Sequence, residues 1–359
     1  MDKQEKNPLT HGTAIQMSEG LENEIDQLPG RVDRYGKAKA RSKEMQAFLC
    51  DQELYRSEYL KLKNCGNWLL FHFYYTISKV RLHSVCLCRK HLICPLCAIL
   101  RASKYMRAYL ERFLYLRSQF PGLYVSMVTL TVKNGSSLTE RDSHLRNCYK
   151  KLEQSRRDTK RGQYKSEWGK VLGLVGTYEY TNTGNGWHPH MHILILHREK
   201  IYHGSLAKQF SGISGDSNII DIRPLSNPDN PAKDFVEVFK YSLKFSELSL
   251  EDNIHAYEKL SGKKLLFSAG LFWGVKLPEN WEDEPFDQAD LPFIEILYNY
   301  MDNVGYSMAG MKNGDLTAVK KPKNPFDHSK ENCCTDVEKL FERVDAHEVE
   351  QIVKKTVVA

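Results

Sequence analysis

One stretch decides the fold of this chain: Trp187-His188-Pro189-His190-Met191-His192-Ile193-Leu194-Ile195-Leu196. It follows a turn-rich segment, and its apolar second half is typical of a buried β-strand. Side chains two apart on a strand share a face, so His190 and His192 project together. Two neutral imidazoles on one face can bind a divalent cation. A pair of histidines satisfied within a core is the alternative interpretation.

A second strand is expected directly before this one. The apolar residues 171–180 form it, and the turn at residues 181–186 joins the two as a hairpin. Glu179 then lies near the turn end, beside His190 and His192. It can be a third metal ligand, or an exposed strand carboxylate with no such role.

Further along, the pattern predicts an α+β fold, an antiparallel sheet backed by helices. Residues 124–132 are rich in β-branched side chains and end at a clear turn, and Ser137 or Thr139 can cap the helix that follows. That helix carries Leu145, Cys148 and Leu152 inward. The other expected elements are strands at 68–75, 218–222 and 265–273, a helix at 231–248 and a short helix at 291–301.

The expected helix at 231–248 has one polar stripe. Asp234, Glu237, Tyr241, Lys244 and Leu248 are spaced three or four residues apart, so they share one face. A carboxylate, a phenol and an amine therefore lie together. For Tyr241, an ordinary position at the edge of a core is the alternative.

A cysteine cluster precedes most of these expected strands and helices. Cys94 and Cys97 form a Cys-x-x-Cys knuckle with Cys86 and Cys88 just upstream, which is structural-zinc spacing. Four thiolates, or three and His91, can close a tetrahedron, and Cys65 is a further candidate ligand. A redox pair or simple buried thiols are the competing interpretations. Because no signal peptide is visible and the protein is expected in the cytoplasm, nine cysteines favour thiols or metal ligands over disulfides.

The segment after the knuckle predicts an amphipathic helix at 98–118. Its outward cations include Arg101 and Lys104, which suits contact with a phosphate backbone. A solvated helix face has the same pattern. The formal charge of +6 and the pI near 8.7 indicate an anionic partner only mildly.

The length of 359 residues allows one large domain or two ordinary ones. We expect a mobile polar arm at 1–45, a zinc-knuckle and basic-helix region at 46–118, a catalytic domain at 119–280 and an extension of unknown role at 281–359. No apolar stretch of about 18 residues is present, so we expect no membrane partner.

Three blocks of this chain resemble, in order, the replication initiators of small rolling-circle plasmids, within the HUH (His-hydrophobe-His) endonuclease superfamily. They are Thr129–Asn134, His188–His192 and Lys240–Lys244, preceded by the Cys94-Pro95-x-Cys97 knuckle. The likeness spans roughly residues 65–275 and covers neither the arm nor the last eighty or so residues. The spacing from Cys88 to Cys94 is slightly stretched compared with the family.

The resemblance implies a metal at His190 and His192 and a nucleophile at Tyr241. It also implies a sequence-specific nick at a plasmid double-strand origin, which frees a 3′ end for the host polymerase. A host helicase is the other expected partner. The expected cation is Mg²⁺ or Mn²⁺, held by both histidines and Glu179. The nearby metal or Lys244 would favour the phenolate, and Glu237 would activate water for a terminating cleavage. The expected substrate is single-stranded DNA or an extruded hairpin.

Two other functions fit parts of the sequence. The His188-x-His190-x-His192 pattern is also typical of histidine-triad nucleotide hydrolases, in which a histidine is the nucleophile and no metal is needed. A non-catalytic zinc-dependent DNA-binding regulator would use the cysteine cluster alone. Metal dependence separates the first alternative from the nicking enzyme, and covalent capture of DNA separates both.

Overall fold

The computed structural model of this chain describes residues 24–217, 219–225, 231–240, 245–283 and 291–313. These residues belong to two compact units. The larger unit consists of residues 37–67 and 86–283, and the smaller one takes its described residues from 24–36, 68–85 and 291–313. The division differs from the expected domains, because the cysteine cluster and the histidine strand lie in one unit.

A five-stranded sheet forms the centre of the larger unit, in the order β6-β3-β5-β4-β7. Every neighbouring pair is antiparallel, which confirms the predicted fold class. The strands are β3 (Tyr124–Thr131), β4 (Val171–Asn182), β5 (Trp187–His197), β6 (Ile220–Pro224) and β7 (Leu266–Gly270). Gly184 and Gly186 adopt positive φ of 89° and 83° in the hairpin turn between β4 and β5, a region that glycine enters without steric cost.

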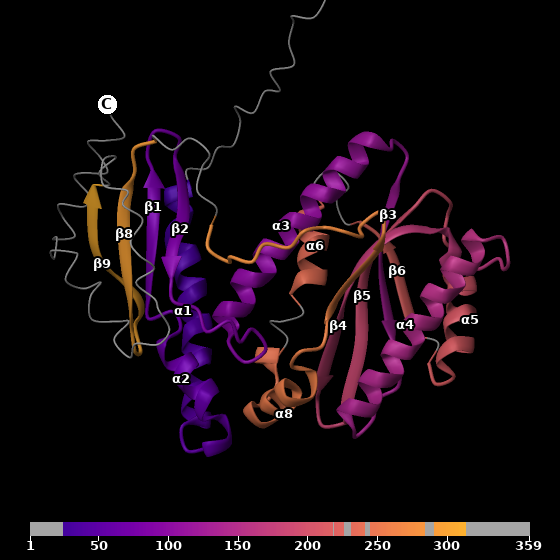
Figure 1. Ribbon diagram of the computed structural model, residues 1–359, viewed down its shortest axis with the longest axis horizontal. Coiled ribbons are helices and arrows are strands. Elements are labelled where there is room, and N and C mark those ends of the chain that lie inside the picture. The colour runs from indigo at the N-terminus through magenta and orange to yellow at the C-terminus, as the bar shows by residue number, and fades with distance from the viewer. Residues whose placement is uncertain (1–23, 218, 226–230, 241–244, 284–290, 314–359) are drawn as a thin grey trace, which may run out of the picture. The chain divides into compact units, whose positions relative to one another are not determined.

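Helices cover both faces of this sheet (Figure 1). Helices α3 (Pro95–Gln119) and α6 (Ala232–Phe239) lie on one face, and α4 (Leu138–Lys160) and α5 (His203–Ser214) lie on the other. Strand β5 is therefore buried on both sides: Leu194 and Leu196 pack in the core with α3 and α6, whereas Ile193 and Ile195 pack in the core with α4 and α5. This double burial explains its continuous apolar run.

The predicted start of helix α4 at its N-cap is confirmed. The Ser137 hydroxyl accepts a hydrogen bond from the Glu140 amide and caps the helix, as predicted. Leu145, Cys148 and Leu152 are buried, also as predicted. The larger unit is completed by the second part of α1 (Glu24–Leu49), η1 (Glu53–Tyr55), α2 (Arg56–Asn64), η2 (Trp168–Lys170), η3 (Phe245–Glu247) and α8 (Leu250–Leu260).

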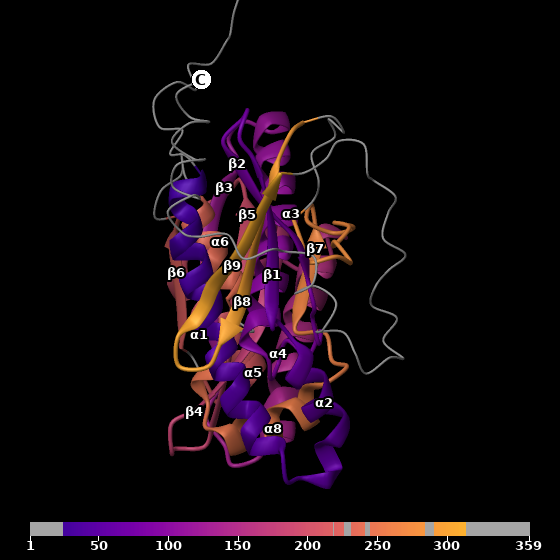
Figure 2. The ribbon, with the colours of Figure 1, turned by 90° about the vertical axis from the view of Figure 1, so that its left-hand side faces the viewer.

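The smaller unit contains a second antiparallel sheet, in the order β2-β1-β8-β9. Its strands are β1 (Trp68–Tyr74), β2 (Lys79–Val85), β8 (Ile294–Met301) and β9 (Gly305–Asn313), of which β1, β8 and β9 run side by side in Figure 2. The expected short helix at 291–301 is therefore wrong. Ile294, Ile296 and Tyr298 are buried at every second position, which is the period of a strand.

The expected polar arm at 1–45 is also wrong in its second half. Residues 24–45 belong to the 26-residue helix α1. Leu28, Val32 and Tyr35 are buried in the smaller unit, and Met45 and Leu49 are buried in the larger one. The arm's basic end is thus a packed helix.

The predicted helix at 231–248 is only partly described. Helix α6 spans Ala232–Phe239 and ends with Lys240 as its C-cap, and η3 begins at Phe245. Residues 241–244, with the predicted nucleophile Tyr241 and its neighbour Lys244, lie outside the described residues. None of the described helices is both long and apolar enough to cross a membrane.

Candidate active site and metal centres

The hairpin of β4 and β5 brings together the predicted metal ligands. Glu179 and His190 are direct partners in the strand register. The Oε2 atom of Glu179 lies 3.0 Å from Nε2 of His190 and 3.5 Å from Nε2 of His192. One ligand atom from each side chain lies within 4.8 Å of the others. The predicted position of Glu179 beside both histidines is confirmed.

Buried polar atoms in this group fit a cation. Within the described part of the chain, Glu179 Oε1 and His190 Nδ1 are buried without a hydrogen-bond partner. A buried carboxylate atom without a partner is costly, and a bound cation would remove that cost. His190 and His192 keep 14% and 20% of their side chains exposed, whereas Glu179 keeps 1%. Three protein ligands with an open side are typical of a catalytic metal site, because substrate or water can complete the coordination.

The charge state of Glu179 suits the same role. Burial would raise the pKa of this carboxyl, but hydrogen bonds and charge from His190 and His192 outweigh burial and lower it to about 2. The carboxylate is therefore ionised at neutral pH. A deprotonated carboxylate between two imidazoles is a ligand set for a divalent cation.

A contact with Thr129 fixes the orientation of the His192 imidazole. His192 Nδ1 lies 3.0 Å from the Thr129 hydroxyl of β3, its partner in the register. This contact leaves Nε2 directed at Glu179. His188 is not part of the three-residue group. Its Nδ1 contacts the side-chain oxygen of Asn134 instead.

Helix α6 packs on the sheet face that carries the metal ligands. The Thr177 hydroxyl donates to the Val238 carbonyl at 2.8 Å, and Thr177 lies two residues before Glu179. On α6 itself, Asp234 is buried, so it is not on an open polar stripe. Glu237 is about a third exposed and forms an ion pair of 2.6 Å with Lys240.

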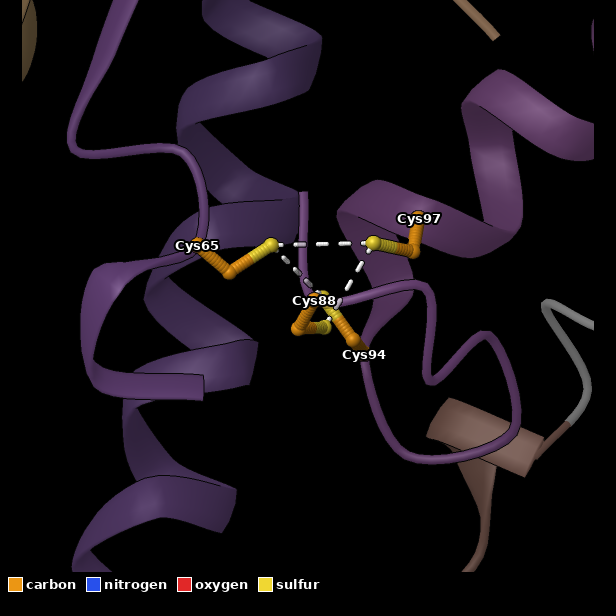
Figure 3. A group of neighbouring side chains, drawn as sticks. All are labelled: Cys65, Cys88, Cys94 and Cys97. Atoms are coloured by element: carbon orange, nitrogen blue, oxygen red, sulfur yellow. Dashed lines mark hydrogen bonds between the residues drawn. The ribbon is translucent and has the colours of Figure 1, made fainter. Parts of the chain in front are cut away.

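Four cysteines form a second group, shown in Figure 3. The Sγ atom of Cys65 lies 3.6 Å from those of Cys94 and Cys97, and Cys88 Sγ lies 3.5 Å from Cys97 Sγ. A regular tetrahedron with Zn–S bonds of about 2.3 Å has edges of about 3.8 Å. The four sulfurs therefore fit a tetrahedral zinc ion, and all four cysteines are free thiols.

The membership of this group corrects the sequence-based ligand set. Cys86 is not among the four, and neither is His91. Cys65, the C-cap of α2, supplies the fourth sulfur. Spacing within 86–97 could not reveal it, because the contact depends on how α2 and the knuckle pack together.

Helix α1 supplies polar neighbours that the sequence reasoning missed. Ser42 Oγ lies 3.3 Å from Cys94 Sγ. Lys39, 1% exposed, donates to the Cys65 carbonyl and, at 2.9 Å, to the Asn67 side chain. Hydrogen bonds from the neighbouring cysteines, led by Cys65, hold the pKa of Cys94 well below its usual range. A buried ammonium and a hydroxyl beside thiolates compensate part of their negative charge.

The two DNA-binding candidates on α3 differ from expectation. Lys104 is buried, and its Nζ lies 3.8 Å from Asp283, so the predicted outward position is wrong. Arg101 is half-buried, and its guanidinium lies 4.3 Å from the Tyr105 ring centroid. Helix α3 is more deeply packed than its charge pattern indicated.

Comparison with known proteins gives one match. The family model described as "Replication protein" (Rep_1) matches residues 79–295, which include the Cys94–Cys97 knuckle, the hairpin of β4 and β5 and helix α6. No curated protein and no solved structure matches the chain.

Proposed function

Since the chain belongs to the replication protein family of rolling-circle plasmid initiators, we propose that it nicks one DNA strand at the plasmid's double-strand origin with Tyr241 as the nucleophile. The group of Glu179, His190 and His192 is the observation that carries this proposal. It combines an ionised buried carboxylate with two partly exposed imidazoles, a donor set that can bind a divalent cation, and the family resemblance implies Mg²⁺ or Mn²⁺. Such a cation, when bound, polarises the scissile phosphate.

The position of α6 supports Tyr241 in this role. Helix α6 packs on the face of Glu179, and Lys240, the residue before Tyr241, is its C-cap. In the proposed reaction the Tyr241 oxygen forms a bond to phosphorus. The bond from phosphorus to the 3′ oxygen breaks, and that oxygen takes a proton to become the 3′ hydroxyl. The 5′ phosphate stays on the tyrosine as an ester, which preserves the bond for rejoining.

Two further side chains have proposed roles. A phenol has a pKa near 10 in water, so the Lys244 ammonium would favour the phenolate. Glu237 would take a proton from water or from an attacking hydroxyl when the cycle ends. Glu237 pairs with Lys240 at 2.6 Å, and it lies four residues before Tyr241 in the sequence.

The proposed partners follow from the product. A free 3′ hydroxyl is a primer for the host polymerase, and the host helicase would unwind the strand ahead of it. The nick site would be presented as single-stranded or hairpin-extruded DNA, because a flexible single strand enters a recessed site more easily than a stiff duplex does. We expect the protein to nick its origin in the cytoplasm, where plasmid DNA is found.

The test is a nicking assay on supercoiled plasmid that carries the cognate origin. With Mg²⁺ or Mn²⁺ the wild-type protein should open the plasmid and remain linked to DNA after denaturation. Tyr241→Phe should lose both products and keep origin binding, while Tyr202→Phe, an exposed tyrosine on the other face of the sheet, should behave as wild type. A nick without a covalent link would favour the histidine-triad reaction. Binding without any nick would favour the non-catalytic regulator.

A further inference from the structure

A long groove of about 1020 Å³ lies within the larger unit. It follows β7, an edge strand of the five-stranded sheet, and its lining includes residues of α3, of α4, of the loop at 261–265 and of the knuckle at 88–92. The groove reaches both faces of the sheet edge: Ser268 of β7 bonds Tyr109 of α3, whereas Phe267 packs against Tyr178 on the α4 side. None of the proposed metal ligands except Cys88 lines it.

The groove is strongly cationic. None of the described lining residues is aspartate or glutamate. Seven of them are lysine or arginine, namely Lys61, Arg89, Lys90, Arg101, Arg146, Lys263 and Lys264. Two acids pair with cations of the lining: Asp142 with Arg146 at 2.6 Å and with Lys263 at 2.7 Å, and Glu58 with Lys90 at 3.2 Å. The seven cations outnumber these two carboxylates. The groove therefore presents a positive field to an anionic chain.

The lining also contains aromatic rings. Trp273, in the turn after β7, is 75% exposed. The Arg146 guanidinium lies 4.3 Å from the Tyr178 ring centroid, and Phe267 tilts against Tyr178 at 4.8 Å. Leaving an indole this exposed forgoes the gain from burying it, and such rings serve as platforms on which unpaired bases stack.

The groove also leads toward the proposed nicking site. The Tyr178 amide donates to the Leu265 carbonyl at 2.9 Å, where β7 begins. Tyr178 lines the groove, and Glu179 is the next residue of the same strand, on the opposite face. A DNA strand bound in the groove would therefore run along β7, which pairs with β4, the strand that carries Glu179.

We propose that this groove binds single-stranded DNA beside the nick, through its phosphates on the lysines and arginines and its bases on Trp273. The proposal rests on the proposed nicking function and adds where the strand lies. A duplex keeps its base faces stacked inside and cannot use Trp273, whereas an unpaired strand presents both phosphates and base faces.

The test measures binding of a fluorescein-labelled oligothymidylate, which has no origin sequence and forms no hairpin, by polarisation in EDTA over a range of salt. Trp273→Ala should weaken binding roughly 5- to 150-fold, the range for loss of one base stack, while Trp273→Phe should restore most of it. Tyr164→Ala removes another exposed ring, 57% exposed, that lies outside the groove, and should have no effect.

Charge is tested with two matched double variants. The double variant Lys61→Glu with Lys264→Glu should weaken the salt dependence. The negative slope of log affinity against log salt should become smaller in magnitude by about 1.4, since each phosphate contact on a single strand contributes about 0.7. Lys165→Glu with Lys208→Glu changes the net charge equally at exposed positions outside the groove and should leave the slope near wild type. Equal effects from both pairs, an unchanged affinity of Trp273→Ala, or stronger binding of duplex than of oligothymidylate would overturn the proposal.

These outcomes are separable from those of the nicking function. If the groove variants bind and nick as wild type does, the groove proposal fails and the nicking function stands. If wild-type protein binds oligothymidylate through Trp273 but never nicks origin DNA, the nicking function fails and the groove stands as a binding site.

Discussion

At the scale of single residues, the four-cysteine group depends on which residue supplies its fourth sulfur. Cys65 completes the four-sulfur group and Cys86 does not, although the two lie on either side of β1 and β2. Cys65→Ser should therefore lose tightly bound zinc and lower the melting temperature of the protein. Cys86→Ser, the matched control, should keep about one zinc per chain. Elemental analysis after dialysis measures the difference, and zinc loss in both variants would contradict the assignment.

Residue patterns predicted the catalytic metal group more completely than the zinc group. Glu179, His190 and His192 belong to one hairpin, so strand alternation and a short turn are enough to place them together. Cys65 reaches the knuckle only through tertiary packing. No rule about spacing contains that information. For the same reason the burial of Lys104 against Asp283 could not be read from the period of its helix.

At the scale of elements, helix α1 provides polar side chains next to the four-cysteine group. Lys39→Met keeps the length of the side chain and removes its charge, so the negative charge of four thiolates would lose a buried counter-charge. We expect zinc affinity to fall roughly 10- to 100-fold, the range for loss of a residue that contacts metal ligands. Lys43→Met on the same helix, at a half-exposed position, is the control. Competition with a chromogenic chelator measures both, and equal affinities would show that Lys39 only packs.

Helix α6 carries a prediction about termination. Glu237→Gln removes a base and keeps the shape, so first-strand nicking should remain near wild type while termination slows by roughly 100-fold, within the usual contribution of a general base. Oversized products in a replication assay report that defect. Lys240→Gln breaks the same ion pair of 2.6 Å but keeps the carboxylate. If both variants terminate equally slowly, Glu237 acts only as a partner of Lys240.

The elements themselves show where sequence reasoning was sufficient. Strands β3, β4, β5 and β7 were predicted because apolar or β-branched runs bounded by turns are typical of strands. Helix α1 was missed because two of its inward positions, Lys39 and Ser42, are polar and face the cysteines, which hides the helical period. Strand β8 was mistaken for a helix, although the alternation of Ile294, Ile296 and Tyr298 was a signal for a strand.

At the scale of the whole molecule, two groups with different donors should hold two metals independently. Four thiolates bind zinc tightly, whereas two imidazoles and a carboxylate on an open site exchange a hard cation quickly. Brief EDTA treatment should therefore abolish nicking, leave zinc in place, and be reversed by Mn²⁺. His190→Ala should lose roughly 100-fold or more in nicking rate, since a metal contributes several kcal/mol to the transition state, and should retain its zinc.

The control for that separation is His188→Ala, because His188 contacts Asn134 and lies outside the metal group. It should nick at a rate closer to wild type than His190→Ala does. Loss of zinc and of nicking together after brief chelation would mean that the two groups are not independent.

The smaller sheet has a consequence for the order in which the chain is synthesised. Strand β1 has two partners: β2, which follows it at once, and β8, which emerges from the ribosome more than two hundred residues later. The sheet of the larger unit, by contrast, has all its strands once Gly270 has been made. In the interval one edge of β1, with the sequence Trp-Leu-Leu-Phe-His-Phe-Tyr, waits without the strand that will cover it. An apolar edge of this kind pairs readily with other chains. The pairing of β8 with β1 therefore covers an edge that would otherwise be open to pairing with other chains.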